Sequence, residues 1–448
     1  MLEFHPLTLS AKEILTAPLS RNDAKDCDAA FANLYMWSPH YGYQWALAEG
    51  CPVIRCLVPD ISNASVARSG YFVPGAAPAD LSALGGVLSD DASKRGEPLR
   101  LYNLSSETAA YIAAEARDFY AVDSMRSLSD YIYSRESLAT LHGRRYQPKR
   151  NHINRFVSMF DYSVEPLRAA DAVECLSLAE RWREEHHTPR SAWVERQVLE
   201  RAFAAYDELG LHGVALRVEG RLAAFSFGSY FGRDGHMFCV HAEKADTSFE
   251  GVYAVVCNEL AKSLDPECDI VDREEDMGIA GLRRSKSSWQ PLDIVDKYTA
   301  VRLDDEQIGI RRLWESVFGD SRRDVDAFLV RYYSPERSVV RYHGDRVTAM
   351  AHIVPLTTEA GRTAYIYAVA TDPAFRGRGL ARSVVDECIA RARRAGFDSV
   401  ALIPAEESLK GFYAAAGFGD TAMPMTFPGD YDLGTGDPAR DLAMCLKF

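Results

Sequence analysis

The chain has 448 residues, of which 47% are hydrophobic, 26% charged and 11% aromatic. This composition is typical of a globular protein and excludes a disordered or collagen-like chain. Its 51 Lys and Arg residues against 64 Asp and Glu residues give a net charge of -13, which disfavours nucleic acid as a partner unless basic residues gather on one face. At roughly 150 residues per domain, the length predicts about three domains.

The first 300 residues combine short strands with amphipathic helices. The expected strands cover 53–57, 211–218, 222–230 and 236–241, and the expected helices cover 170–185 and 252–264. We place one boundary near residue 130, ahead of a basic stretch, and another near residue 300, where a terminal strand over 292–301 precedes a new helix. The predicted domains are 1–130, 131–300 and 301–448.

The C-terminal part alternates helices and strands in the manner of an α+β domain. The expected helices cover 304–318, 322–333, 380–395 and 408–416, and the expected strands cover 338–342, 347–355, 363–370, 399–403, 422–427 and 441–448. The helix over 380–395 places its apolar residues on one face, which is the spacing of a helix lying on a sheet.

Nine cysteines are scattered along the chain. Their odd number, together with the absence of Cys-x-x-Cys and His-x-x-x-His spacings, predicts a reducing, cytoplasmic setting and no metal. We interpret Cys51 and Cys56 as strand packing. The N-terminus carries Glu3 and His5 in place of a basic and an apolar segment, and no run reaches the roughly 18 apolar residues of a membrane helix. We therefore expect no export signal and no transmembrane segment.

The sharpest motif is a strand, a turn and a helix over 364–392. The turn, Arg376-Gly377-Arg378-Gly379, passes into an amphipathic helix, so that backbone N–H groups and the positive end of the helix dipole can converge on a pyrophosphate. The glycines let the backbone approach the anion, and the arginines add positive charge. The alternative is an ordinary connection between a strand and a helix.

Arg376-x-x-Gly379-x-Ala381, preceded by Asp372-Pro373 and followed by a strand and a helix that carries Tyr413, resembles the GNAT family of N-acetyltransferases over residues 302–448. The resemblance implies that the pyrophosphate of acetyl-CoA is bound by Arg376, Gly377, Arg378, Gly379, Leu380 and Ala381. It also implies that the pantetheine arm is bound by a strand end that splays at a bulge, Val369, Ala370 and Thr371. The Val369 N–H would polarise the thioester carbonyl.

By the same resemblance, Tyr413 would protonate the departing CoA thiolate, because a phenol is protonated at pH 7. The alternative for Tyr413 is packing in the core. No general base is visible, since the strand over 364–370 carries no carboxylate. Glu406, Glu407 and a base acting through water remain candidates, and the two glutamates are more typical of a solvated surface.

Four stretches of the N-terminal part resemble a bacterial family of uncharacterised proteins related to the C-terminal domain of phosphatidylglycerol lysyltransferase. They lie at 130–134, 141–156, 241–246 and 272–286. The resemblance covers most of residues 1–300 and implies two GNAT-like subdomains in tandem. In relatives of this type, the transferred group can be an aminoacyl group from tRNA.

A degenerate repeat links the two parts, because Asp246 to Gly251 aligns without gaps with Asp372 to Gly377. The upstream copy loses the second glycine and has Glu250 where the downstream copy has Arg376. A carboxylate facing a pyrophosphate is unfavourable, so the upstream copy is not expected to hold CoA in the usual way.

A basic stretch precedes this repeat and contains no acidic residue. It consists of Arg144, Arg145, Lys149, Arg150 and Arg155. It could meet tRNA phosphates, an anionic lipid headgroup or an acidic substrate. The alternative is a solvated helix face whose arginines pair with the acidic cluster Glu274-Glu275-Asp276.

The sequence thus predicts an α+β chain of tandem GNAT-like domains, with mixed sheets flanked by helices. The predicted activity is transfer of an acetyl group from acetyl-CoA to a small-molecule amine or amino-acid-like acceptor. Two alternatives stay open: an aminoacyl-tRNA-dependent transferase that uses the N-terminal tandem, and a non-catalytic sensor of CoA or a metabolite. The net charge disfavours tRNA as a partner.

Overall fold

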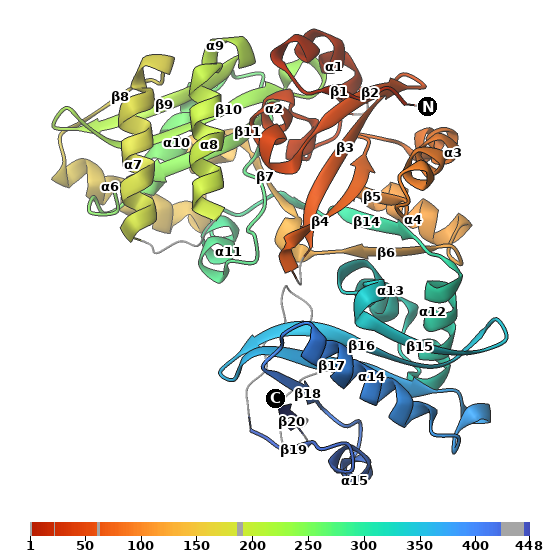
Figure 1. The fold of residues 1–448 in the computed structure, drawn as a ribbon. Coiled ribbons are helices and arrows are strands. Elements are labelled where there is room, and N and C mark those ends of the chain that lie inside the picture. Colours follow the sequence, from red (N-terminus) through yellow and green to blue (C-terminus); the bar gives the residue numbers. More distant parts are fainter. Residues whose placement is uncertain (1, 22, 61–62, 186–190, 423–442) are drawn as a thin grey trace.

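The computed structural model describes residues 2–21, 23–60, 63–185, 191–422 and 443–448, which form three mixed β-sheets flanked by helices (Figure 1). The predicted fold class is confirmed. Each sheet contains one repeated unit, in which three antiparallel strands are followed by a helix and by a strand that pairs parallel to the third. The parallel pair in each unit is therefore the place where a helix crosses over the sheet.

The first sheet has the strand order β1-β2-β3-β4-β5-β14-β6. Its strands are β1 (His5–Pro6), β2 (Gln44–Ala48), β3 (Cys51–Asp60), β4 (Asn63–Phe72), β5 (Arg100–Leu104), β14 (Tyr298–Arg302) and β6 (Tyr120–Ser124). The accompanying helices are α1 (Lys12–Leu19), α2 (Phe31–Tyr41), α3 (Pro78–Lys94) and α4 (Ser106–Glu115). Leu81, Leu84 and Leu88, spaced along one face of α3, bury that face against the sheet.

The second sheet has the strand order β13-β7-β12-β11-β10-β9-β8. Its strands are β13 (Asp293–Val295), β7 (Asp130–Ser134), β12 (Ile270–Asp272), β11 (Met237–Ala245), β10 (Arg221–Phe231), β9 (Leu211–Val218) and β8 (Tyr162–Pro166). Its helices are α5 (Arg135–Thr140), α6 (Gln147–Met159), α7 (Ala172–Glu185), α8 (Ser191–Ala204), α9 (Tyr206–Leu209), α10 (Val252–Ser263) and α11 (Ala280–Ser287).

The third sheet has the strand order β15-β16-β17-β18-β20-β19. Its strands are β15 (Ser338–His343), β16 (Arg346–Thr358), β17 (Gly361–Thr371), β18 (Ser399–Leu402), β20 (Met444–Lys447) and β19 (Gly419–Asp420). Its helices are α12 (Asp305–Phe318), α13 (Arg322–Arg331), α14 (Leu380–Arg394) and α15 (Lys410–Ala414). Both faces are covered: Met350 and Val354 of β16 pack in the cluster of α12 and α13, whereas Ala351 and Ile353 pack in the cluster of α14.

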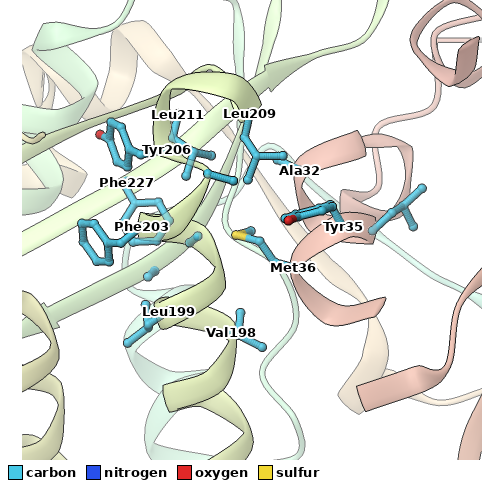
Figure 2. Packing of buried hydrophobic residues seen from close by; sticks show 14 of the residues in the cluster. Ala32, Tyr35, Met36, Val198, Leu199, Phe203, Tyr206, Leu209, Leu211 and Phe227 are labelled. Carbon is cyan, nitrogen blue, oxygen red and sulfur yellow. The ribbon is translucent and has the colours of Figure 1, made fainter. Parts of the chain in front are cut away.

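The first two sheets share one hydrophobic core. In Figure 2, Tyr35 and Met36 of α2 point toward the helix α8, which carries Val198 and Leu199. The same cluster contains Phe227 of β10 and residues of α9. Burial of apolar surface therefore joins the first two sheets into one packed unit.

The third sheet is attached to the first by α13, which packs against β6 (Figure 1). Two arginines make this contact polar. Arg331 donates to both carboxylate oxygens of Asp123, and both side chains are 7% exposed. Arg311 donates to the backbone carbonyls of Arg117 and Tyr120. A bidentate, buried pair of this kind fixes orientation as well as contact.

Two sequence expectations need correction, and a third falls almost entirely outside the described residues. The single strand over 292–301 is wrong, because β13 and β14 lie in two different sheets and are separated by Asp296 and Lys297. The expected helix over 408–416 is shorter, since a 3-10 turn, Glu407–Leu409, precedes α15. The expected strand near 422–427 lies, apart from its first residue, outside the described residues. Of the helices that the structure describes, none is both long and apolar enough to cross a membrane.

Candidate functional site

The predicted anion loop is an open turn at the start of α14. Gly377 and Gly379 have φ values of +74° and +76°, and a Cβ atom added at either would meet no atom within 4 Å. Gly379 is the N-cap of α14, and Arg376 and Arg378 are exposed. The left-handed backbone explains why glycines stand here. The loop thus offers free N–H groups and two cations to an anion at the positive end of a helix of 15 residues.

The strand before this loop is bulged and leaves its neighbour. Between β16 and β17, His352 pairs with Tyr367 and Met350 with Ala370, so Ala368 and Val369 together face one residue. Ala368 has a φ of +52°, which is unusual for a residue with a side chain. Among the described residues, pairing of β17 with β18 ends at Tyr365 and Ala401. The backbone from Val369 to Thr371 therefore lies beyond the part of β17 that is paired with β18.

Tyr413 lies on α15 and is 6% exposed. It packs against Phe412 and Phe418, with ring centroids 5.0 and 6.2 Å away. Burial raises the pKa of its phenol to about 12, so the phenol keeps its proton at neutral pH. Glu406 and Glu407 are exposed, and Glu406 accepts a hydrogen bond from Ser408 at 2.6 Å. The buried tyrosine fits both a proton donor and a core residue.

The upstream copy of the loop is covered by α6. Gly251, the N-cap of α10, has a φ of +91°, and a Cβ atom there would lie 2.6 Å from the carbonyl oxygen of His152. Arg155 on the same helix lies 2.7 Å from the carboxylate of Glu250. The ring of Phe160 packs on Phe249 at 5.1 Å. The space that an anion would need is therefore filled by protein.

The alternative in which the basic stretch pairs with Glu274, Glu275 and Asp276 does not match the contacts of the described residues. Arg155 pairs with Glu250. Arg150 donates to the Gly143 carbonyl at 2.8 Å, and Lys149 donates to Ser288 at 2.7 Å. These partners are a nearby backbone carbonyl, a residue just before α10 and the C-cap of α11. The basic side chains therefore contact the groups that pack against their own helix.

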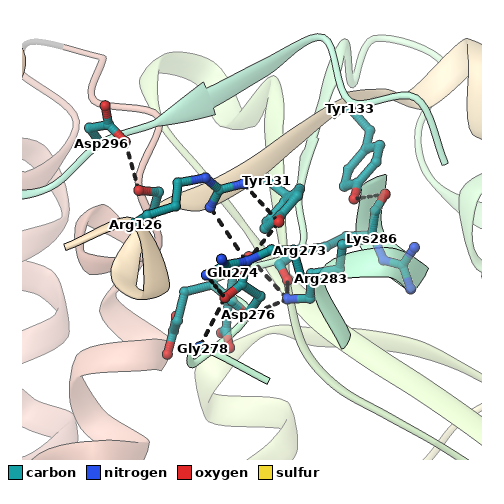
Figure 3. Close-up of polar contacts among 12 residues, drawn as sticks. Arg126, Tyr131, Tyr133, Arg273, Glu274, Asp276, Gly278, Arg283, Lys286 and Asp296 are labelled. Atoms are coloured by element: carbon teal, nitrogen blue, oxygen red, sulfur yellow. Dashed lines mark hydrogen bonds and ion pairs between the residues drawn. The ribbon is translucent and has the colours of Figure 1, made fainter. Parts of the chain in front are cut away.

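Asp276 is instead held by arginines outside the basic stretch (Figure 3). It accepts hydrogen bonds from Arg283 at 2.8 and 3.0 Å, from the Tyr131 hydroxyl at 2.7 Å and from the Gly278 N–H at 2.9 Å. Burial opposes its ionisation, but these hydrogen bonds outweigh burial and lower the pKa of Asp276 to about 2. The loop after β12 is thereby fixed.

A second set of hydrogen bonds holds the same loop. The Lys286 ammonium donates to the carbonyl oxygens of Glu274 and Glu275 at 3.0 and 2.6 Å, and to that of Arg273. The Glu274 backbone, at a φ of +56°, is held by these contacts in a conformation that costs free energy for a residue with a side chain. The Glu274 side chain is therefore presented at a defined position next to β11.

A buried cluster of charges lies between the first two sheets. The Lys297 ammonium is 2.8 Å from Asp130, 3.2 Å from Asp28 and 3.2 Å from the Cys27 sulfur. Burial disfavours the ammonium, but the carboxylates of Asp130 and Asp28 hold the pKa of Lys297 well above its ordinary value. Sequence reasoning missed this cluster, because its members come from residues far apart in the chain.

Residues 20–301 match the profile of the family described as phosphatidylglycerol lysyltransferase, C-terminal, and this match covers more than half of the chain. The chain belongs to this family. Residues 308–418 match the profile of the acetyltransferase (GNAT) family. Both resemblances expected from the sequence are confirmed, and the descriptions of both families name the transfer of acyl groups.

Three relatives illustrate the likeness. A conserved protein of unknown function from Bacteroides thetaiotaomicron is 34% identical, with a TM-score of 0.62 over 68% of this chain and 100% of that chain. L-PGS from Bacillus licheniformis is 12% identical, with a TM-score of 0.47 over 65% of this chain and 91% of that chain. An uncharacterised protein of Mycoplasmoides gallisepticum is 25% identical over 175 residues, and the match spans 38% of this chain and 56% of that curated relative.

Proposed function

We propose that the C-terminal domain transfers an acetyl group from acetyl-CoA to an amine. The observation that carries this proposal is the combination of an open, glycine-based loop at the start of α14 with a bulged strand that leaves its parallel neighbour. Gly377 and Gly379 would leave room for the pyrophosphate, and Arg376 and Arg378 would neutralise it. Leu380 and Ala381 would supply the first N–H groups of the helix.

The end of β17 beyond its pairing with β18 suits the acyl end of the donor. Extended pantetheine amides would pair with the backbone of Val369, Ala370 and Thr371, as an added strand pairs with an exposed edge. In support, the Thr371 hydroxyl is buried without a hydrogen-bond partner among the described residues. The Val369 N–H would donate to the thioester oxygen as negative charge develops on it.

The reaction would begin with attack of the amine nitrogen on the thioester carbon. The tetrahedral oxyanion would then collapse, breaking the carbon–sulfur bond and expelling the thiolate. Tyr413, whose phenol stays protonated because burial raises its pKa to about 12, would give its proton to the sulfur. The amine would lose its proton to solvent, which leaves an amide and CoA.

A screen for CoA release tests this proposal. The full chain is incubated with acetyl-CoA and a panel of amines and amino acids, and free thiol is followed over time. We expect at least one acceptor to release CoA above the rate of hydrolysis, and mass spectrometry to find the acetylated acceptor. Binding of acetyl-CoA without turnover on any acceptor would instead support the sensor.

A second candidate is aminoacyl transfer by the first two sheets. It is favoured by one observation: the parallel pairing of β11 with β12 ends at Cys239 and Asp272, so that among the described residues β11 continues unpaired on that side as β17 does, while α6 fills the loop at Gly251. A place for an acyl group beside β11, without an open loop for the pyrophosphate of CoA, suits a donor other than CoA. A complex with aminoacyl-tRNA whose affinity falls steeply with salt would identify it, and transfer of labelled amino acid would confirm it.

A further inference from the structure

A cysteine, a histidine and a glutamate come together where β11 leaves β12. Cys239 and His241 lie two positions apart on β11. Glu274 lies in the loop after β12 that Arg283 and Lys286 hold by hydrogen bonds (Figure 3). Cys239 is 0% exposed, and the side chains of His241 and Glu274 are 1% and 20% exposed. The group is thus closed on the protein side and reaches solvent only past the carboxylate.

We propose that Cys239, His241 and Glu274 bind a zinc ion. The sulfur of Cys239 is 3.7 Å from Glu274 Oε1, and Nδ1 of His241 is 3.3 Å from the same oxygen. Tetrahedral zinc, with bonds of about 2.3 Å to sulfur and about 2.0 Å to nitrogen and oxygen, sets its ligand atoms about 3.3–3.6 Å apart. The separations from Glu274 to His241 and to Cys239 are therefore within about 0.2 Å of those in a zinc coordination shell, and the Cys239 and His241 atoms lie within 4.8 Å of each other.

Direct hydrogen bonding explains these separations less well. An N–H···O bond has its usual length near 2.9 Å, so 3.3 Å between His241 and Glu274 is long for a buried pair. All three candidate atoms lie within 4.8 Å of one another, as atoms that share one ion must. A thiolate, a carboxylate and a neutral imidazole also balance the charge of a dication.

The orientation of His241 is set by an outer partner. Its Nε2 lies 2.8 Å from the Ser229 hydroxyl on β10, which leaves Nδ1 directed at Glu274. The strand register supports this arrangement: β10 and β11 shift between Phe227 and Gly228, so His241 has no partner on β10. A metal-bound histidine ordinarily has its other ring nitrogen held in this way.

Unsatisfied buried oxygens nearby point independently to a cation. Asp272, which pairs with Cys239 across the parallel strands, is 0% exposed and has an oxygen without a hydrogen-bond partner among the described residues. Asp130, also 0% exposed, likewise has one oxygen without a hydrogen-bond partner among the described residues, while its other oxygen lies 2.8 Å from Lys297. Asp130 lies two positions before Ile132, the partner of Asp272 on β7, and residues in these positions share one face of a sheet. Buried carboxylate oxygens without partners are costly, and a dication beside them lowers that cost.

Sequence spacing could not reveal this site. The expectation of no metal rests on the absence of Cys-x-x-Cys and His-x-x-x-His spacings. Here a Cys-x-His pair on a strand is completed by a glutamate 33 positions from His241. With three protein ligands, the fourth position would be left to water or to a substrate, as in zinc sites that carry out chemistry.

Metal content of the full chain tests the proposal without reference to acyl transfer. The protein is stripped with a chelator, reloaded with Zn²⁺ and desalted, and zinc is counted by mass spectrometry. We expect one zinc per chain. Loading with Co²⁺ should give a thiolate-to-cobalt charge-transfer band, which identifies a cysteine ligand.

Variants assign the ion to this site. Cys239→Ser should remove the charge-transfer band, whereas Cys56→Ser, a matched change at another buried strand cysteine, should keep it. Glu274→Gln should keep the band and lower zinc affinity at least tenfold. Ser229→Ala should lower zinc affinity about tenfold, because His241 would lose the hydrogen bond that orients its ring. If Cys239→Ser does not fold, the zinc affinity of Ser229→Ala still tests the site. Zinc content near zero after reloading, or an unchanged band in Cys239→Ser, would overturn the proposal.

Discussion

The carbonyl oxygen of His152 lies so close to Gly251 that a Cβ atom there would be 2.6 Å from it. The helix α6 thus closes the start of α10, whereas a Cβ atom at Gly379, at the start of α14, would meet no atom of the described residues within 4 Å. We predict that acetyl-CoA binds once per chain. Calorimetric titration of the full chain should give a stoichiometry near one, and a value near two would show that α6 moves away from Gly251.

Gly379→Glu should weaken that single binding event. The new side chain would carry negative charge into the anion loop, and we expect acetyl-CoA affinity to fall at least tenfold, which is about 1.4 kcal/mol. Gly344→Glu is the matched control, since Gly344 also has a positive φ, +58°, and open space around it. Both changes cost about 1 kcal/mol of backbone strain. Equal affinity in the two folded variants would remove the loop from the proposed site.

Tyr413→Phe should lower kcat about 100-fold with little change in acetyl-CoA affinity, because the ring still packs and only the proton donor is lost. Since burial raises the pKa of Tyr413 to about 12, its deprotonation cannot slow the wild-type enzyme between pH 6 and 9. The control is Tyr206→Phe, which removes a buried hydroxyl that has no hydrogen-bond partner among the described residues. A wild-type kcat in Tyr413→Phe, measured where chemistry limits the rate, would leave Tyr413 as a core residue.

His352 should make stability depend on pH. Its side chain is buried between Trp314 and Phe328, and this burial lowers its pKa to about 3. Its pKa in the unfolded chain is about 6.5. Between these values the unfolded chain binds the extra proton, so the contribution to stability is complete above pH 6.5 and is lost as pH falls, by at most about 1.4 kcal/mol per unit.

Thermal unfolding at several pH values between 5 and 8 measures this effect. The unfolding midpoint of the wild type should fall more steeply below pH 6.5 than that of His352→Gln, which has no titrating ring. Other titrating groups contribute to both proteins and cancel in the difference. Parallel curves would mean that His352 is already charged in the folded protein.

The sequence predicted local elements where a single periodicity governs them. The strand over 211–218 coincides with β9, and the helix expected from residue 380 begins there as α14. The prediction of a single strand over 292–301 was wrong for a physical reason. Asp296 accepts a hydrogen bond from Ser129, and Lys297 lies in the buried charge cluster. The chain therefore passes from one sheet to the other at these two residues, although the sequence over 292–301 has the pattern of a single strand.

The candidate sites also differ in whether a sequence motif can predict them. The anion loop at Gly377 and Gly379 is contiguous in sequence, so a motif can find it. The contacts of Asp276 with Tyr131 and of Lys297 with Asp130 join residues more than 100 positions apart, and no spacing rule reaches that far. The roles of the predicted CoA-binding residues and of Tyr413 stay predictions until ligand binding is measured.

The position of β14 has a consequence for synthesis of the chain. This strand, Tyr298–Arg302, lies between β5 and β6 and is antiparallel to both. When residues 1–124 have left the ribosome, β5 and β6 have both been made, but the strand that joins them has not. The first sheet can therefore be completed only after all the described strands of the second have been translated, and β5 and β6 stay unjoined during that interval.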